Sequence, residues 1–251
     1  MRVILTALEE QHAELAALVA AIDDASWQQP TRCPGWSIAD VVLHLAQTDE
    51  LAVASVQGRF RAGLEEFAGG LDAPHNVDDG AAAMVANERG LSDDAVFERW
   101  RTGAAAIRSA LAASDPHHRV EWVAGQLSAR TLAATRLAEC WIHTGDVAEA
   151  LGVAQEPTDR LEHVARLAWR TLPYAFARNG DRLTGPVAFD LCAPSGRRWH
   201  FVPETPAATI IEGPGAELCL VAARRIAAKA TSLRGTGPDA EAVLQLVRTY
   251  A

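Results

Sequence analysis

The chain has 251 residues, of which 49% are hydrophobic and 22% are charged, and its formal net charge is −9. This length allows one large core or two domains, and the negative charge with scattered arginines argues against a nucleic-acid-binding surface. Apolar runs are shorter than the ~20 residues of a membrane helix, and the first residues lack a signal-peptide pattern. We therefore expect a globular cytoplasmic protein without a membrane partner.

The first 152 residues are predicted to form a helical bundle. Apolar residues recur at helical spacing over residues 3–23. Ser37 followed by Asp40 is a typical helix start, and the second helix is expected to run to about residue 60. Residues 62–79 contain glycines and Pro74, which predicts loops with at most one short helix. A third helix is expected from residue 92 to 114, and a fourth from residue 128 to 151, ended by Gly152.

The pattern changes after Gly152. Residues 158–179 are predicted to be helical, and the apolar runs at 186–193 and 199–202, separated by a Pro-Ser-Gly turn, predict a hairpin. Another strand is expected at 208–212. Two further helices are predicted at 216–230 and 240–250. Residues 153–251 therefore read as a small α+β domain, and the whole chain as an α+β protein.

Glu139 and His143 suggest a metal site. In a helix, residues four apart lie on one face, ~6 Å apart along the axis, which one ion can bridge. The best third ligand is His44, in an apolar run of the second helix. Two histidines and one carboxylate leave a coordination position open for water or substrate. Taken alone, the spacing also fits ordinary hydrogen bonding in a helical core.

Four cysteines are present without a CxxC pair, which indicates reduced thiols rather than a structural zinc cluster. Cys140 follows Glu139, but a helix turns it ~100° away from the ligand face, so we interpret it as a core residue. Cys33 lies in the loop before the second helix, a place that would allow it to lie nearer to the expected site.

Two segments resemble a known family. TRCPGWSIADVVLHL (residues 31–45) and ECWIHTGD (residues 139–146) are similar to motifs of the mycothiol-dependent maleylpyruvate isomerase family, part of the DinB-like metalloprotein superfamily. The resemblance implies a DinB-like four-helix bundle at 1–152 and a sterol-carrier-like α+β domain at 153–251. It also implies a divalent metal, usually zinc, on His44, Glu139 and His143; nickel, iron and manganese suit the same donors.

In these isomerases a thiol cofactor becomes a thiolate, adds to an unsaturated acid and leaves after a double bond has rotated. The resemblance therefore implies mycothiol as co-substrate and a small-molecule substrate, in an isomerase or S-transferase reaction. The chain is most similar to an actinobacterial branch whose reactions are largely unassigned. A thiol-independent hydrolase, lyase or isomerase, and a non-catalytic metal- or ligand-binding protein, remain alternatives. The oligomeric state is not predicted.

Further residues are candidates for the site. Gln47 and Thr48 lie one turn after His44 and would contact a bound cofactor, with hydrogen bonding in the core as the alternative. Asp146 would orient a ligand or contact the cofactor, with a surface position as the alternative. Arg136, one turn before Glu139, would steady that carboxylate or bind substrate charge, and the alternative, which we favour, is a solvated side chain.

Arg224 is the candidate catalytic residue of the second domain. Residues 220–224 resemble a family segment that ends in an arginine facing the cleft, and Arg225 is the competing candidate. A guanidinium group there would bind a substrate carboxylate through two hydrogen bonds. The alternative is an ordinary arginine on a helix surface.

Overall fold

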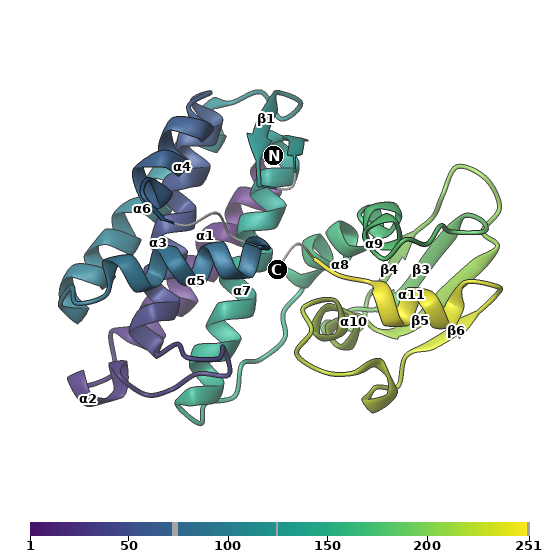
Figure 1. Ribbon diagram of the computed structural model, residues 1–251. Coiled ribbons are helices and arrows are strands. Elements are labelled where there is room, and N and C mark those ends of the chain that lie inside the picture. Colours follow the sequence, from purple (N-terminus) through teal and green to yellow (C-terminus); the bar gives the residue numbers. More distant parts are fainter. Residues whose placement is uncertain (72–74, 124, 250–251) are drawn as a thin grey trace. The chain divides into compact units, whose positions relative to one another are not determined.

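Figure 1 shows a computed structural model of the protein, which describes residues 1–71, 75–123 and 125–249. The chain divides into two compact units, Met1–Gln155 and Glu156–Ala251. The first unit is mainly helical, and the second combines helices with a sheet. The predicted α+β class is therefore confirmed.

The first unit contains both long and short elements. In chain order they are α1 (Arg2–Val19), α2 (Asp24–Trp27), α3 (Ile38–Val56), α4 (Phe60–Ala68), α5 (Val77–Glu88), α6 (Asp93–Ala113), β1 (Arg119–Trp122), β2 (Gly125–Ser128) and α7 (Ala129–Ala150). The long helices α1, α3, α6 and α7 contact one another as a bundle, with α3 packed against α6 and α7 and α1 against α6 and α7. These are the four helices that periodicity predicts.

The helix ends follow from local chemistry. Ser37 and Asp40 form a reciprocal capping box at the start of α3: the Ser37 hydroxyl accepts from the Asp40 amide at 3.3 Å, and the Asp40 carboxylate accepts from the Ser37 amide at 3.0 Å. The Ser128 hydroxyl caps α7 by accepting from the Thr131 amide. Beyond the end of α7, Gly152 has a φ of 67°, which favours glycine. These caps fix where the helices that carry the candidate ligands begin and end.

Helices α3 and α7 lie at the centre of this unit, because most of their side chains are buried. A core cluster joins α1, α3, α6 and α7, and includes Leu15, Leu45, Trp100 and Val147. A second cluster lies around Leu51, Ile107 and Leu132. Polar side chains that emerge from α3 and α7 inside the bundle are therefore held in a tightly packed environment.

Two features of the first unit depart from the prediction. The stretch 62–79 carries α4, the one short helix that the prediction allowed, but α5 begins at its end and continues through residues for which no helix is predicted; residues 72–74, including Pro74, lie outside the described residues. Helix α5 buries only Met84 and Val85, so its Ala-rich sequence has little apolar periodicity to reveal it. The β1–β2 hairpin, paired Val120 to Leu127, is short and only half buried, and was not predicted.

The second unit has a mixed four-stranded sheet in the order β4-β3-β5-β6. Its elements are α8 (Leu161–Arg170), α9 (Leu172–Arg178), β3 (Val187–Cys192), β4 (Arg198–Phe201), β5 (Thr209–Pro214), α10 (Gly215–Ala222), the 3₁₀ turn η1 (Ala228–Ala230), β6 (Arg234–Thr236) and α11 (Ala240–Leu246). Strands β3 and β4 form the predicted hairpin, with Leu191 opposite Trp199, while β3 and β5 are parallel. Helix α10 contacts α8 and β5.

Three predicted helices of this unit differ in length. The helix expected over 158–179 divides into α8 and α9, because Pro173 at the start of α9 has no amide hydrogen to continue the ladder. The helix expected over 216–230 ends at Ala222, where Arg224 adopts a φ of 60°, and the chain continues to β6. The last helix ends at Leu246; the predicted end at residue 250 lies outside the described residues.

Within the part of the chain that the structure describes, no helix combines the length and apolar character needed to cross a membrane.

Candidate metal centre

His44 on α3 meets Glu139 and His143 on α7 inside the bundle. The Nε2 atom of His44 lies 3.7 Å from Oε2 of Glu139, and Nε2 of His143 lies 3.8 Å from the same oxygen. All three donor atoms lie within 4.8 Å of one another. These separations are longer than hydrogen bonds. They approach the ~3.4 Å between two ligands that hold one ion at ~2.1 Å in tetrahedral geometry.

The three donor side chains are largely buried but keep a small solvent-exposed area. The side chains of both histidines are 9% exposed and that of Glu139 is 12% exposed. The Trp36 ring lies 5.0 Å from the His44 ring, and the two imidazoles meet edge to face at 5.1 Å. Packing therefore limits the rotation of both imidazoles, while a small exposed area leaves an approach for water or a ligand.

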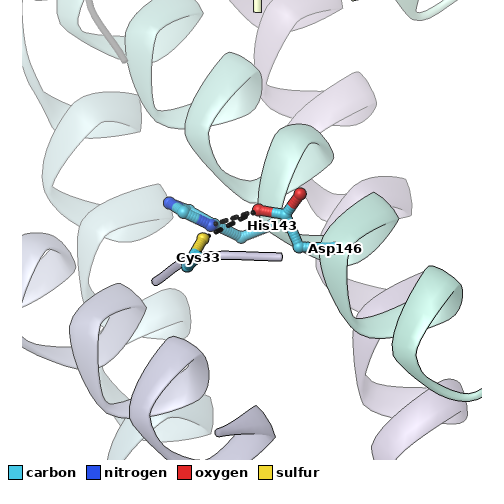
Figure 2. A group of neighbouring side chains, drawn as sticks. All are labelled: Cys33, His143 and Asp146. Atoms are coloured by element: carbon cyan, nitrogen blue, oxygen red, sulfur yellow. Dashed lines mark hydrogen bonds and ion pairs between the residues drawn. The ribbon is translucent and has the colours of Figure 1, made fainter. Parts of the chain in front are cut away.

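Asp146 orients His143. Figure 2 shows its carboxylate beside the His143 ring. The Oδ2 atom lies 3.0 Å from Nδ1 of His143, and the Asp146 side chain is 1% exposed. An ionised carboxylate only accepts hydrogen bonds, so Nδ1 carries the proton. When the imidazole is neutral, its lone pair is therefore on Nε2, toward Glu139. Hydrogen bonding of a metal-binding histidine to a carboxylate is the usual outer support of such sites, and the alternative of a surface acid is excluded by the burial.

The electrostatics favour a proton or a cation among these residues. Burial lowers the pKa of His44, so this imidazole is neutral and free to ligate. Burial alone would raise the pKa of Glu139, but His44, His143 and Arg136 lower it below its usual value. Burial opposes protonation of His143 too, yet Asp146, Cys33 and Glu139 together raise its pKa to about 9. A carboxylate and two imidazoles around one point are a donor set that suits a divalent ion.

Arg136 is buried, which corrects the prediction that it is solvated. Its side chain is 1% exposed; Nε donates to Oδ1 of Asp49 at 2.9 Å and Nη2 donates to the Thr48 hydroxyl at 2.8 Å. The Thr48 hydroxyl in turn donates to the His44 carbonyl at 2.8 Å. Spacing along α7 could not reveal this, because the partner acid lies on α3. The network ties α7 to the helical turn that carries His44.

Gln47 and Thr48 make structural hydrogen bonds. The Gln47 amide nitrogen donates to the Met84 carbonyl at 3.0 Å and to the Glu88 carboxylate at 2.6 Å, which joins α3 to α5. Thr48 is part of the Arg136 network. These contacts correspond to the core alternative, and a direct role of either residue in cofactor binding stays a prediction.

Arg224 lies just after α10 in the second unit, with Nη1 donating to the Gln245 carbonyl at 2.8 Å. Together with Lys229, it lines a pocket of about 640 Å³ within that unit. The neighbouring Arg225 donates from Nη1 to the Ala223 carbonyl at 2.9 Å and is half-buried. The assignment of Arg224 as catalytic stays a prediction.

The two cysteines of the first unit have different surroundings. Cys140 is 1% exposed, and burial raises the pKa of its thiol well above the usual range, so it is the core residue that the sequence predicted. Cys33 is half-buried, and its thiol donates to Oδ2 of Asp146 at 3.3 Å (Figure 2). The sequence offered only its loop position as a sign of this contact.

Comparison with known protein families matches the part of the chain that contains the candidate metal ligands. Residues 8–148 match the family model described as the mycothiol maleylpyruvate isomerase N-terminal domain. The match includes all three candidate ligands and Asp146. The chain belongs to the mycothiol maleylpyruvate isomerase family.

Relatives of this family member cover both units. Two uncharacterised proteins of Mycobacterium tuberculosis, from strains H37Rv and CDC 1551, are each 32% identical over 249 residues, covering 97% of this chain and 93% of the relative. Crystal structures of mycothiol-dependent maleylpyruvate isomerase and of its histidine-to-alanine mutant are similar, with TM-scores of 0.58 and 0.60. At 18% identity and 95% coverage of both chains, these two structures establish a common fold.

Proposed function

We propose that this protein is a divalent-metal-dependent isomerase or S-transferase that uses mycothiol and acts on a small molecule. The observation that carries the proposal is the convergence of His44, Glu139 and His143, with Asp146 holding one imidazole in the ligating tautomer. Family membership supports the thiol, because the family model and the similar structures carry mycothiol in their names.

The residues fit a divalent ion. Both Nε2 atoms face one carboxylate oxygen at distances too long for hydrogen bonds, and three protein ligands leave room for an exogenous one. A bound divalent ion would lower the pKa of a coordinated thiol and so favour its nucleophilic thiolate form at neutral pH. Zinc is the ion we expect, and nickel, iron and manganese accept the same donors.

The protein's own residues would prepare this chemistry in three ways. Asp146 holds the proton on Nδ1 of His143, so that Nε2 points its lone pair to the site. The Glu139 carboxylate supplies a negative charge that stabilises a cation in a poorly hydrated setting. Trp36 packs on His44 and reduces access of water. Cys140 does not supply the thiol, because it is buried and its pKa is raised.

The proposed substrate class rests on Arg224. Arg224 would bind a carboxylate group, so an unsaturated or electrophilic carboxylic acid is the substrate we propose. A thiolate adds to an electron-poor carbon of the double bond in such an acid, which then becomes a single bond. The thiolate either leaves again after rotation about that bond or stays as the transferred group. These two outcomes distinguish the isomerase from the S-transferase.

Metal content by mass spectrometry tests the metal centre. We expect about one divalent ion per chain in the wild type and loss of that ion in His44→Ala and in His143→Ala. His117→Ala is the matched control, because His117 is exposed in a loop. A folded wild type that neither contains nor takes up a divalent ion would refute the metal-dependent function.

Calorimetric titration of the metal-loaded protein with mycothiol tests the thiol. Binding to the wild type, with none to the metal-free His143→Ala variant, is the expected result. If the loaded wild type binds metal but no mycothiol, the thiol-independent hydrolase, lyase or isomerase replaces this proposal. A closed coordination shell with four protein ligands and no exchangeable water would instead indicate a binding protein.

A further inference from the structure

Cys33 and Trp36 stand at the two ends of one tight turn. The Trp36 amide donates to the Cys33 carbonyl at 3.0 Å, Pro34 occupies the second position, and Gly35 has a φ of 77° at the third. Proline followed by a residue with positive φ is the pattern of a type II β-turn. The turn therefore sets both side chains at fixed positions before α3 begins.

The turn is held in place on both sides. The Thr31 hydroxyl accepts from the Cys33 amide at 3.2 Å and donates to the Trp36 carbonyl at 3.0 Å. From α5's C-terminal end, Arg89 donates through Nη2 to the Gly35 carbonyl at 2.7 Å. A segment with this many backbone contacts presents its side chains with little conformational freedom.

Both ends of the turn reach the candidate metal centre. Trp36 packs against the His44 ring at 5.0 Å, while the Cys33 thiol donates to Oδ2 of Asp146 at 3.3 Å. The same Asp146 oxygen holds Nδ1 of His143 at 3.0 Å. One oxygen thus receives two hydrogen bonds, which fixes the plane of the carboxylate more firmly than one would (Figure 2).

The position of the sulfur separates it from the proposed ion. Cys33 and Asp146 gather on the Nδ1 side of the His143 ring, whereas His44 and Glu139 lie on the Nε2 side. The two nitrogens of an imidazole point in different directions, so a single ion at Nε2 does not meet the sulfur. The distances from Asp146 Oδ2 to Nδ1 of His143, 3.0 Å, and to Sγ of Cys33, 3.3 Å, are also those of hydrogen bonds.

We propose that Cys33 is a positioning residue of the metal centre, whose thiol fixes the Asp146 carboxylate that orients His143. This inference rests on the proposed metal-dependent function and assigns a further residue to it. Cys33 neither ligates the ion nor takes part in covalent chemistry. It acts through Asp146 on the direction in which the Nε2 lone pair points.

Cobalt(II) binding to Cys33→Ala, Cys33→Ser and the wild type tests the proposal. We expect alanine to weaken the affinity about threefold to tenfold, less than the 10–100-fold typical of a residue bonded directly to a ligand, because a thiol is a weak donor one step further away. Serine keeps a hydroxyl donor and should restore most of the affinity. Cys192→Ala, an exposed cysteine of the second unit, is the control and should bind as the wild type does.

The cobalt spectrum decides between positioning and ligation. The visible bands should shift in Cys33→Ala and return in Cys33→Ser, without a thiolate charge-transfer band in any variant. A charge-transfer band in the wild type that disappears in Cys33→Ala would make Cys33 a ligand and overturn the proposal. Unchanged affinity and bands in Cys33→Ala would overturn it as well.

A metal-free measurement keeps the test independent of the proposed function. If the wild type takes up no cobalt, the metal-dependent function fails, and the ¹⁵N chemical shifts of the His143 imidazole then decide the role of Cys33. These shifts should change in Cys33→Ala but not in Cys192→Ala. If they are the same in both variants and the wild type, Cys33 does not position His143.

Discussion

Replacing Asp146 by asparagine is the most direct test of how His143 is held. Asparagine has nearly the same size, but it lacks the charge that stabilises the Nδ1–H proton. The lost interaction is a buried hydrogen bond of 3.0 Å to a side chain that is 1% exposed. Removing an outer carboxylate of this kind typically weakens metal binding about 10–100-fold, which equals about 1.4–2.7 kcal/mol.

The assay is a competition titration of zinc against a chromophoric chelator, with circular dichroism to verify that Asp146→Asn is folded. The chain offers a matched control in the second unit, because Oδ1 of the half-buried Asp190 also lies 3.1 Å from Nδ1 of an exposed histidine, His200. Asp190→Asn should leave the zinc affinity unchanged. A folded Asp146→Asn that binds zinc as tightly as the wild type would refute the assignment of Asp146 as the group that orients His143.

Two further predictions concern stability. His12 accepts from Arg108 at 2.6 Å, and burial with this cation lowers its pKa to about 4, so the unfolded chain binds the extra proton between pH 6.5 and 4. Between pH 7 and pH 4, the free energy of unfolding measured in urea should therefore fall by about 3 kcal/mol more for the wild type than for His12→Gln. Equal decreases in the two proteins would contradict a buried neutral imidazole at His12. Gly35→Ala and Gly58→Ala, with φ of 77° and 72° and no described atom within 4 Å of an added Cβ, should each cost about 1–2 kcal/mol in unfolding experiments. Only Gly35→Ala should also weaken metal binding, and equal metal affinities would argue against the turn as a support of the site.

The sequence predicted the elements whose signals are local. The capping pair Ser37 and Asp40, the apolar periodicity of α1, α3, α6 and α7, and the glycine after α7 each act within one or two helical turns. Helix α5 was missed for the same reason, since it buries only Met84 and Val85 and has little periodicity to read. The Glu139–His143 pair was readable because four residues on a helix always face the same way.

Contacts between distant segments depended on the tertiary structure. Arg136 was predicted to be solvated, yet it is buried because its partner Asp49 projects from α3, 87 residues away in the sequence. His44 was the best candidate third ligand from its place in an apolar helical run, and the resemblance of the surrounding motif to a known family strengthened that choice. The spacing of residues within α3 and within α7 does not predict which faces of the two helices contact each other.

The sequence by itself thus predicted the four long helices of the bundle, the family and the candidate pair Glu139 and His143 on α7, because each is encoded by neighbouring residues or by a recognisable motif. The tertiary structure alone decided that Cys33, 113 residues before Asp146, donates to the carboxylate that orients His143. The physical reason is that such a hydrogen bond forms only when a tight turn and the packing of two helices bring its atoms within about 3.5 Å, and no local pattern encodes that distance.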